Sequence, residues 1–282
     1  MVAVEAADAA EVVVADAEAK MKIGLGYRRE LSGWLLTKPR GVECLEITAE
    51  HFYEDGHQLL TELAKEFPLL VHGLGLSLGT PGPLDTDKLE RFATVSRAAS
   101  AQWISEHVAF TRTAEIDLGH LNPVPPTRDT VKVMAEHARE LAARCCKPLL
   151  LENITSHLRL EGDLSETEFL NELCAQANCG LLLDVTNLFI NSCNHCFDPL
   201  EWLQELDASR VRQLHIVGYS RDGARYTDGH SEPIQPELLD LARFIIQRSP
   251  VQAIILERDE NFPGPQAMAQ ELAKLENLRA TN

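Results

Sequence analysis

Leu181-Leu182-Leu183-Asp184 is a short apolar run that ends on a carboxylate, and similar runs, most of them with His, Asp or Glu at or near their end, recur along the chain. The runs occupy residues 23–26, 44–50, 69–72, 103–107, 149–153, 181–184, 214–215 and 254–257. Nearly continuous apolar runs are typical of parallel strands covered on both faces. Such a strand has no structural need for an ionisable residue at its end. The active site of a barrel enzyme, however, lies at the carboxyl ends of its strands.

Segments with helical periodicity alternate with these runs. They cover residues 56–67, 85–98, 128–144, 165–177, 198–206, 235–247 and 265–276, with residues 28–37 as a short further candidate. Ser165 and Glu168 form a capping box, and Asp198 precedes a proline, which are both helix start signals. Eight strand-then-helix units in 282 residues fit the roughly 250 residues of a TIM barrel. We therefore predict the α/β class and one (β/α)8 barrel domain over residues 21–282.

An open, doubly wound sheet is the alternative architecture. It is disfavoured because Gly24 and Gly26 are followed by Tyr27 and two arginines, and not by the G-x-G-x-x-G turn that opens a helix.

The composition limits the partners and the compartment. The net charge is −17, from 43 acidic and 26 basic residues, which argues against nucleic acid or an anionic membrane as partner. No stretch approaches the roughly 18 apolar residues of a membrane span. Residues 1–20 lack the features of a signal peptide and are expected to form a flexible extension. Seven cysteines, an odd number, favour a reducing cytoplasm over a disulfide framework.

The residues at the strand ends predict a metal centre. In a closed barrel these ends converge on one axis. The candidate ligands are His72, His107, Glu152, Asp184, His215 and Glu257, with Asp228 and His230 from a D-x-H sequence that we expect in an extended loop. Eight ligands suffice for two or three ions, and an oxygen and nitrogen set favours iron, manganese or zinc.

Other polar residues near these ends have weaker signals. Asn153 and Asn187 could orient ligands, bind substrate or simply close turns, and Glu46 and Glu50 could face the barrel interior or support a ligand. We place catalysis at Asp184, His215 and Asn187, and substrate contacts at Asn153 and His195, the latter in the loop after the sixth strand. Asp259 is expected to be a surface cap, His137 to face solvent, and Cys193 with Cys196 to lack the second cysteine pair of a zinc site.

Five motifs together resemble those of the multinuclear non-heme iron dependent oxidative enzymes. They are His72-Gly73-Leu74-Gly75-Leu76-Ser77-Leu78-Gly79, Ser105-Glu106-His107, Leu151-Glu152-Asn153, Leu182-Leu183-Asp184-Val185-Thr186-Asn187 and Leu214-His215-Ile216-Val217-Gly218. That family includes the methanobactin-biosynthesis oxidase and an enzyme that excises a carbon from the C-terminal cysteine of a peptide.

The resemblance implies a TIM barrel with two or three iron ions in a mixed-valent state. It also implies oxidation, with dioxygen, of cysteine or another residue in a ribosomally made precursor peptide, and a separate peptide-binding partner protein. The family's ligands fall on the same eight positions, and Asn187 and His195 match further polar positions. One departure is Tyr219, where relatives often have histidine.

Two other classes of protein remain open. One is a different TIM-barrel metalloenzyme, such as a sugar isomerase or a zinc phosphodiesterase of the endonuclease IV type. The other is a non-catalytic barrel that binds a metal or a peptide.

Overall fold

The computed structural model describes residues 20–113 and 115–279. Eight parallel strands close into a barrel in the spatial order β1-β12-β9-β8-β7-β4-β3-β2. They are β1 (Lys22–Gly26), β2 (Cys44–Thr48), β3 (Leu69–His72), β4 (Ile104–His107), β7 (Leu149–Glu152), β8 (Gly180–Asp184), β9 (Val211–Ile216) and β12 (Ala253–Leu256). The predicted TIM barrel is confirmed. The predicted extension over residues 1–20 lies outside the described residues except for Lys20.

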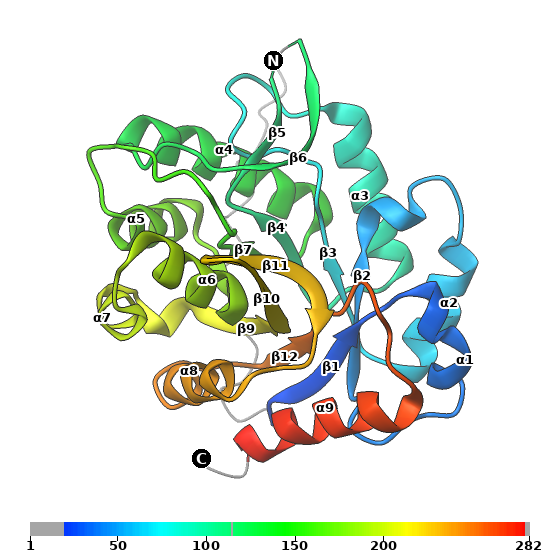
Figure 1. The fold of residues 1–282 in the computed structure, drawn as a ribbon. Helices are drawn as coiled ribbons and strands as arrows, with labels where there is room; N and C mark the ends of the chain where they lie inside the picture. The colour runs from blue at the N-terminus through cyan, green and yellow to red at the C-terminus, as the bar shows by residue number, and fades with distance from the viewer. Residues whose placement is uncertain (1–19, 114, 280–282) are drawn as a thin grey trace, which may run out of the picture.

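Helices form a ring around the strands (Figure 1). They are α1 (Ser32–Leu35), α2 (His57–Glu66), α3 (Thr86–Ala98), α4 (Arg128–Cys145), α5 (Glu166–Ala177), α6 (Val185–His195), α7 (Pro199–Glu205), α8 (Pro236–Ile246) and α9 (Pro265–Arg279), with the 3-10 turns η1 (Arg29–Leu31), η2 (Ala49–Phe52) and η3 (Ala208–Arg210). Within residues 20–113 and 115–279, no helix combines the length and the apolar character needed to cross a bilayer.

The sequence analysis missed helix α6, and it placed His195 in a loop where the structure has the last residue of this helix. The segment contains β-branched residues and several asparagines, which are weak helix formers. Its start is fixed by Asp184, whose side chain accepts a hydrogen bond from the backbone N–H of Asn187. Packing therefore overrides a weak intrinsic preference here.

Residues two apart on a strand point to the same side, and this alternation sorts the barrel residues. An apolar cluster that includes Cys44, Leu70, Leu150, Leu182 and Ile255 is buried separately from the core under the helices. Two residues further along each of these strands, or just past its end, lie Glu46, His72, Glu152, Asp184 and Glu257. The polar side chains therefore share the inner face of the barrel with this apolar cluster, and form the layer nearest the carboxyl ends of the strands.

Two antiparallel hairpins extend from this end of the barrel. They are β5 (Phe110–Arg112) with β6 (Asp117–Asn122), and β10 (Gly218–Asp222) with β11 (Arg225–Glu232). The first is visible beyond the barrel next to α4, and the second lies across the barrel beside α6 (Figure 1). Asp228 and His230 are therefore on a strand, and not in the extended loop that we expected.

His137 of α4 does not face solvent, contrary to the expectation from its sequence. It is 6% exposed, with Nδ1 at 2.8 Å from the carbonyl oxygen of Leu78 and Nε2 at 2.7 Å from that of Gly82. The imidazole therefore ties the long loop after β3 to α4.

The substitution Gly24→Ala should destabilise the barrel by about 2–3 kcal/mol, because overpacking a tight core forces backbone shifts. A Cβ at this position would overlap the carbonyl oxygen and Sγ of Cys44 on the neighbouring strand. Denaturant unfolding would measure the change. The control Gly33→Ala, in helix α1 with no atom within 4 Å of the added Cβ, should instead stabilise slightly.

Candidate metal centre

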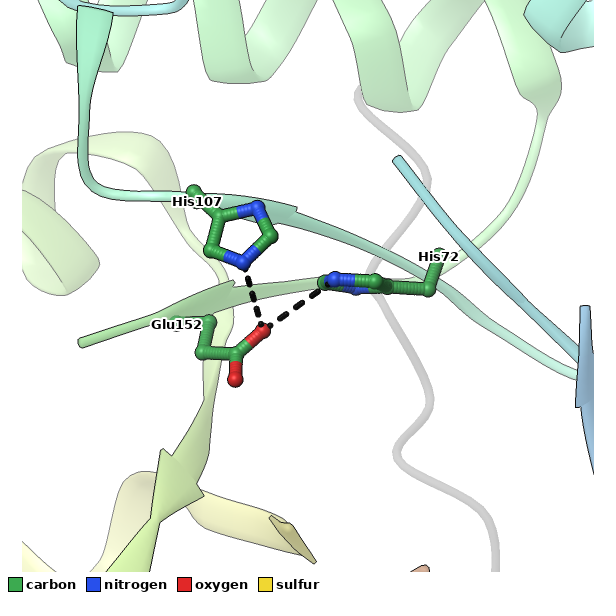
Figure 2. A group of neighbouring side chains, drawn as sticks. All are labelled: His72, His107 and Glu152. Atoms are coloured by element: carbon green, nitrogen blue, oxygen red, sulfur yellow. Dashed lines mark ion pairs between the residues drawn. The ribbon is translucent and has the colours of Figure 1, made fainter. Parts of the chain in front are cut away.

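The first group of candidate ligands is His72, His107 and Glu152. Nε2 of each histidine lies 3.3 Å from Oε2 of Glu152, and Figure 2 shows the two imidazoles facing this one oxygen from β3 and β4. The other ring nitrogens are held from behind, because Nδ1 of His72 lies 2.8 Å from Ser105 Oγ and Nδ1 of His107 lies 3.0 Å from the carbonyl oxygen of Gly73. Such contacts orient the free Nε2 atoms toward a common point.

The second group contains Glu152, Asp184, His215 and Glu257, all buried. Nδ1 of His215 lies 3.0 Å from Glu152 Oε1 and 2.9 Å from Glu257 Oε2. The register of the barrel creates this proximity, since Asp184 pairs with His215 across β8 and β9, and His107 pairs with Glu152 across β4 and β7. Glu152 belongs to both groups, which places two candidate sites on either side of one carboxylate.

A third group consists of His230, Glu257 and Asp259. Nδ1 of His230 lies 3.1 Å from Asp259 Oδ2, whereas Asp228 Oδ2 lies 2.9 Å from the other ring nitrogen, Nε2. Asp259, which we expected to be a surface cap, thus joins this group, and it also accepts a hydrogen bond from Arg28 Nε at 2.8 Å. Asp228 lies beside the group and orients His230; its role as a ligand stays a prediction.

Tyr219 takes no part in these groups. Its ring stacks on Phe189 with centroids 5.0 Å apart, and its hydroxyl donates to Glu237 at 2.5 Å. The side chain at the position where the resembled family often has histidine is therefore engaged with α6 and α8.

The donor atoms of the three groups fit a metal. Among the described residues, the buried atoms that lack a hydrogen-bond partner include His72 Nε2, Glu152 Oε2, Asp184 Oδ2, Asp228 Oδ1 and His230 Nδ1. Buried polar atoms are rarely left unpaired, so each calls for an explanation. These five belong to predicted ligands; bound cations would satisfy those of the three groups, and Asp228 Oδ1 lies beside the third group.

The pKa shifts of the candidate ligands also indicate that this cluster of charges is suited to a bound cation. Burial raises the pKa of Asp184 well above its usual range, and the nearby carboxylates of Asp228 and Glu152 raise it further. Burial alone would lower the pKa of His215, but Glu257, Glu46 and Glu152 raise it well above the ordinary value. The pKa of His72 falls well below it, through burial and the neighbouring rings of His107 and His215. A bound cation would relieve the crowding of carboxylates.

Metal removal should accordingly lower the thermal stability. A ligand at about 100 times its Kd stabilises a fold by about 2.7 kcal/mol, and a domain of this size shifts by about 2–4 °C per kcal/mol. We expect the melting temperature to fall by roughly 5–10 °C on treatment with a chelator, and calorimetry with and without re-added iron(II) measures it. An unchanged melting temperature would contradict metal binding in the folded barrel.

The three residues predicted to bind substrate or assist catalysis on weaker signals, Asn153, Asn187 and His195, make hydrogen bonds to backbone carbonyl groups in this structure. Asn153 receives a hydrogen bond from the Asp184 backbone N–H at 2.8 Å and donates to its carbonyl oxygen at 3.0 Å. Asn187 donates to the carbonyl oxygen of Asn153 at 3.2 Å, and its Oδ1 accepts from Thr155. His195 lies 2.8 Å from the carbonyl oxygen of Ser156. Their substrate or catalytic roles stay predictions.

Glu46, Gln213 and Trp103 form a buried chain of polar contacts behind His215, and the sequence analysis named only Glu46 of these three. Glu46 Oε1 lies 2.7 Å from His215 Nε2, so both interpretations of Glu46 hold: it faces the barrel interior and contacts a candidate ligand. Gln213 donates to Glu46 and accepts from Trp103 Nε1 at 2.6 Å. The signal for Gln213 is its spacing two residues before His215 on β9, which places both on the inner face. Glu50 instead accepts from the backbone N–H groups of Leu74 and Gly75, at 2.9 and 2.8 Å.

Known proteins resemble this chain over nearly its whole length. The family model described as "RiPP precursor modification enzyme MbnB/TglH/ChrH" matches residues 22–280. The chain belongs to this family. It is 33% identical to a UPF0276 protein of Pasteurella multocida, covering 90% of this chain and 92% of that one, and 29% identical to a UPF0276 protein of Rhizorhabdus wittichii, covering 88% and 91%. The resemblance noted in the sequence is thus confirmed.

Solved structures share the fold of this MbnB/TglH/ChrH family member at low identity. A 3-keto-D-glucoside 4-epimerase from E. coli superposes with a TM-score of 0.58 at 16% identity, covering 92% of this chain and 100% of that one. Endonuclease IV from Thermus thermophilus has a TM-score of 0.58 at 17% identity, covering 92% and 98%. At these identities the likeness concerns the barrel alone.

Proposed function

We propose that this chain is an iron-dependent oxidoreductase that uses dioxygen to modify cysteine, or another residue, of a ribosomally made precursor peptide. Membership of a family of precursor modification enzymes supports a peptide substrate. The observation that carries the proposal is the position of Glu152, shared by two adjacent ligand groups at the mouth of the barrel. One carboxylate between two sites is suited to a centre with more than one ion.

The ligand types are compatible with iron. Histidine and carboxylate donors suit iron, manganese and zinc, and no cysteine belongs to the three groups among the described residues. Iron bound here would supply redox chemistry with dioxygen and would favour the thiolate form of a coordinated cysteine. The chain itself would fix the geometry through Ser105, Gly73 and Glu46, and would exclude water, since every member of the first two groups is buried.

We propose that His72, His107, Glu152, Asp184, His215, Asp228, His230 and Glu257 hold two or three ions in a mixed-valent state, that a separate protein presents the peptide, and that the reaction takes place in the cytoplasm. Asp259 is an additional candidate ligand of the third ion, because it lies in the group with His230 and Glu257.

Elemental analysis of protein produced with iron, combined with Mössbauer spectroscopy, tests the metal. Two or three coupled irons per chain, together with oxygen consumption on addition of the precursor peptide, would support the proposal. One zinc or manganese per chain without iron would instead favour a hydrolase or isomerase, as in other barrels of this fold. In addition, His215→Ala should lose or misplace metal and abolish turnover while the barrel stays folded; full activity of this variant would refute the proposal.

A further inference from the structure

A cavity of about 340 Å³ is lined by residues that directly follow two candidate ligands, Val108 after His107 and Asn153 after Glu152. The cavity continues past Ile154 to Trp202 of α7. Helices α5, α6 and α7, which supply much of its wall, are neighbours in the barrel ring (Figure 1). Its volume lies at the lower end of the roughly 300–1,000 Å³ of small-molecule sites, so it suits a side chain more than a folded segment.

The wall combines apolar surface with carboxylates. Phe169, Phe197 and Trp202 line the cavity, together with Leu158, which is 64% exposed. Four carboxylates, those of Glu166, Asp198, Glu201 and Glu205, share the cavity with one guanidinium, that of Arg159. Within residues 20–113 and 115–279, no ion pair with lysine or arginine neutralises any of the four.

Glu166 is in direct contact with the aromatic wall. Its Oε2 accepts a hydrogen bond from Trp202 Nε1 at 3.0 Å. Desolvation by the surrounding protein raises the pKa of this carboxyl, although Trp202, His195 and Arg159 each oppose the rise. Because no lysine or arginine among the described residues forms an ion pair with Glu166, its charge is available to a further cation.

We propose that this cavity is a subsite for a basic side chain, lysine or arginine, of the peptide substrate, close in sequence to the residue that is modified. The apolar stem of such a side chain would pack against Leu158 and the aromatic residues, and its charged head would lie among the carboxylates. The inference rests on the proposed function, because it assumes that the peptide's reacting residue lies at the metal centre. It adds a charge preference that the metal ligands alone do not give.

Calorimetric titration of the metal-loaded enzyme under argon tests the subsite without turnover. The probes are short, end-blocked peptides with one cysteine and one lysine, moved from two to four positions before or after the cysteine, and matched peptides with uncharged norleucine in its place. We expect one lysine position to bind about tenfold more tightly than its norleucine match, and the difference to shrink at high salt.

Two variants assign the preference to the cavity. Glu166→Gln keeps an oxygen that can accept from Trp202, so the helix should stay in place while the lysine preference is lost. The control Glu140→Gln, an exposed residue of α4 outside the cavity, should retain it. A lysine preference that survives in Glu166→Gln, or no preference at any position, would overturn the subsite.

The subsite and the oxidase proposal can fail independently of each other. If the lysine preference holds but no peptide, including the full precursor, is oxidised in air, the subsite stands and the oxidase proposal fails. If peptides are oxidised equally with lysine and norleucine, the oxidase proposal stands and the subsite fails.

Discussion

Glu152→Gln should remove metal from two of the three candidate sites at once and lower turnover by more than about a hundredfold. The first group would keep only two histidines, and the second would lose one of four ligands. Loss of a residue that merely orients a ligand already costs about 10–100-fold in metal affinity or activity, and Glu152 is itself a candidate ligand of two ions. Elemental analysis and oxygen consumption with peptide measure the two effects.

The stability of the metal-free variant separates this explanation from unfolding. Glu152 is 1% exposed, burial raises its pKa, and its Oε2 has no hydrogen-bond partner. Glu152 is also the charge partner of His72, His107 and His215, so its replacement by a neutral amide should cost the metal-free protein some stability. A metal-free variant that still unfolds cooperatively, well above the assay temperature, is nevertheless folded. Loss of activity would then reflect loss of metal.

Asp259→Asn is the matched control, since Asp259 belongs only to the third group. It should release at most one ion and leave the first two sites filled. Retention of full metal content and activity in Glu152→Gln would show that the shared carboxylate is not a ligand.

The barrel was predictable because its strands repeat one pattern. Each run of Leu, Ile and Val has the length of a buried strand, and the polar residue that follows marks the open end. The inner face could also have been derived, since Leu150 with Glu152, and Leu182 with Asp184, have the period of two that places residues on one side of a strand.

The features that were missed depend on contacts between distant segments. Helix α6 has a weak intrinsic signal and is stabilised by the Asp184 cap and by packing. The hairpin that carries His230 has no strong strand pattern, and Asp259 joins the third group only because β12 ends beside that hairpin. The cavity also could not be predicted, because its walls come from loops and helices on separate βα units.

Glu46→Gln should weaken metal binding at the second group by about 10–100-fold, the usual cost of removing a carboxylate that supports a histidine ligand. Glu46 Oε1 lies 2.7 Å from His215 Nε2, and both residues are buried. A proton held on Nε2 by this carboxylate leaves the lone pair of Nδ1 facing Glu152 and Glu257. Competition titration with a chromophoric chelator measures the affinity.

The neighbours of Glu46 explain why an amide of the same shape cannot replace it. Glu46 serves two donors at once, His215 Nε2 through Oε1 and Gln213 Nε2 through Oε2. Gln213 cannot turn over without loss, because its Oε1 accepts from Trp103 Nε1 at 2.6 Å. A glutamine at position 46 has one acceptor oxygen, so either His215 or Gln213 would face an N–H group. His215 would then be free to tilt or to change its protonated nitrogen.

Glu50→Gln, in the 3-10 turn η2 that follows β2, distinguishes this effect from the loss of any nearby carboxylate. Glu50 holds the backbone of Leu74 and Gly75 and has no contact with His215 among the described residues. It should therefore change the stability of the loop after β3 and leave metal affinity at the second group nearly unchanged. Nitrogen NMR of labelled histidine adds a direct readout, since the tautomer signal of His215 should change only in Glu46→Gln. Equal metal affinity in Glu46→Gln and the parent would mean that the barrel wall alone orients His215.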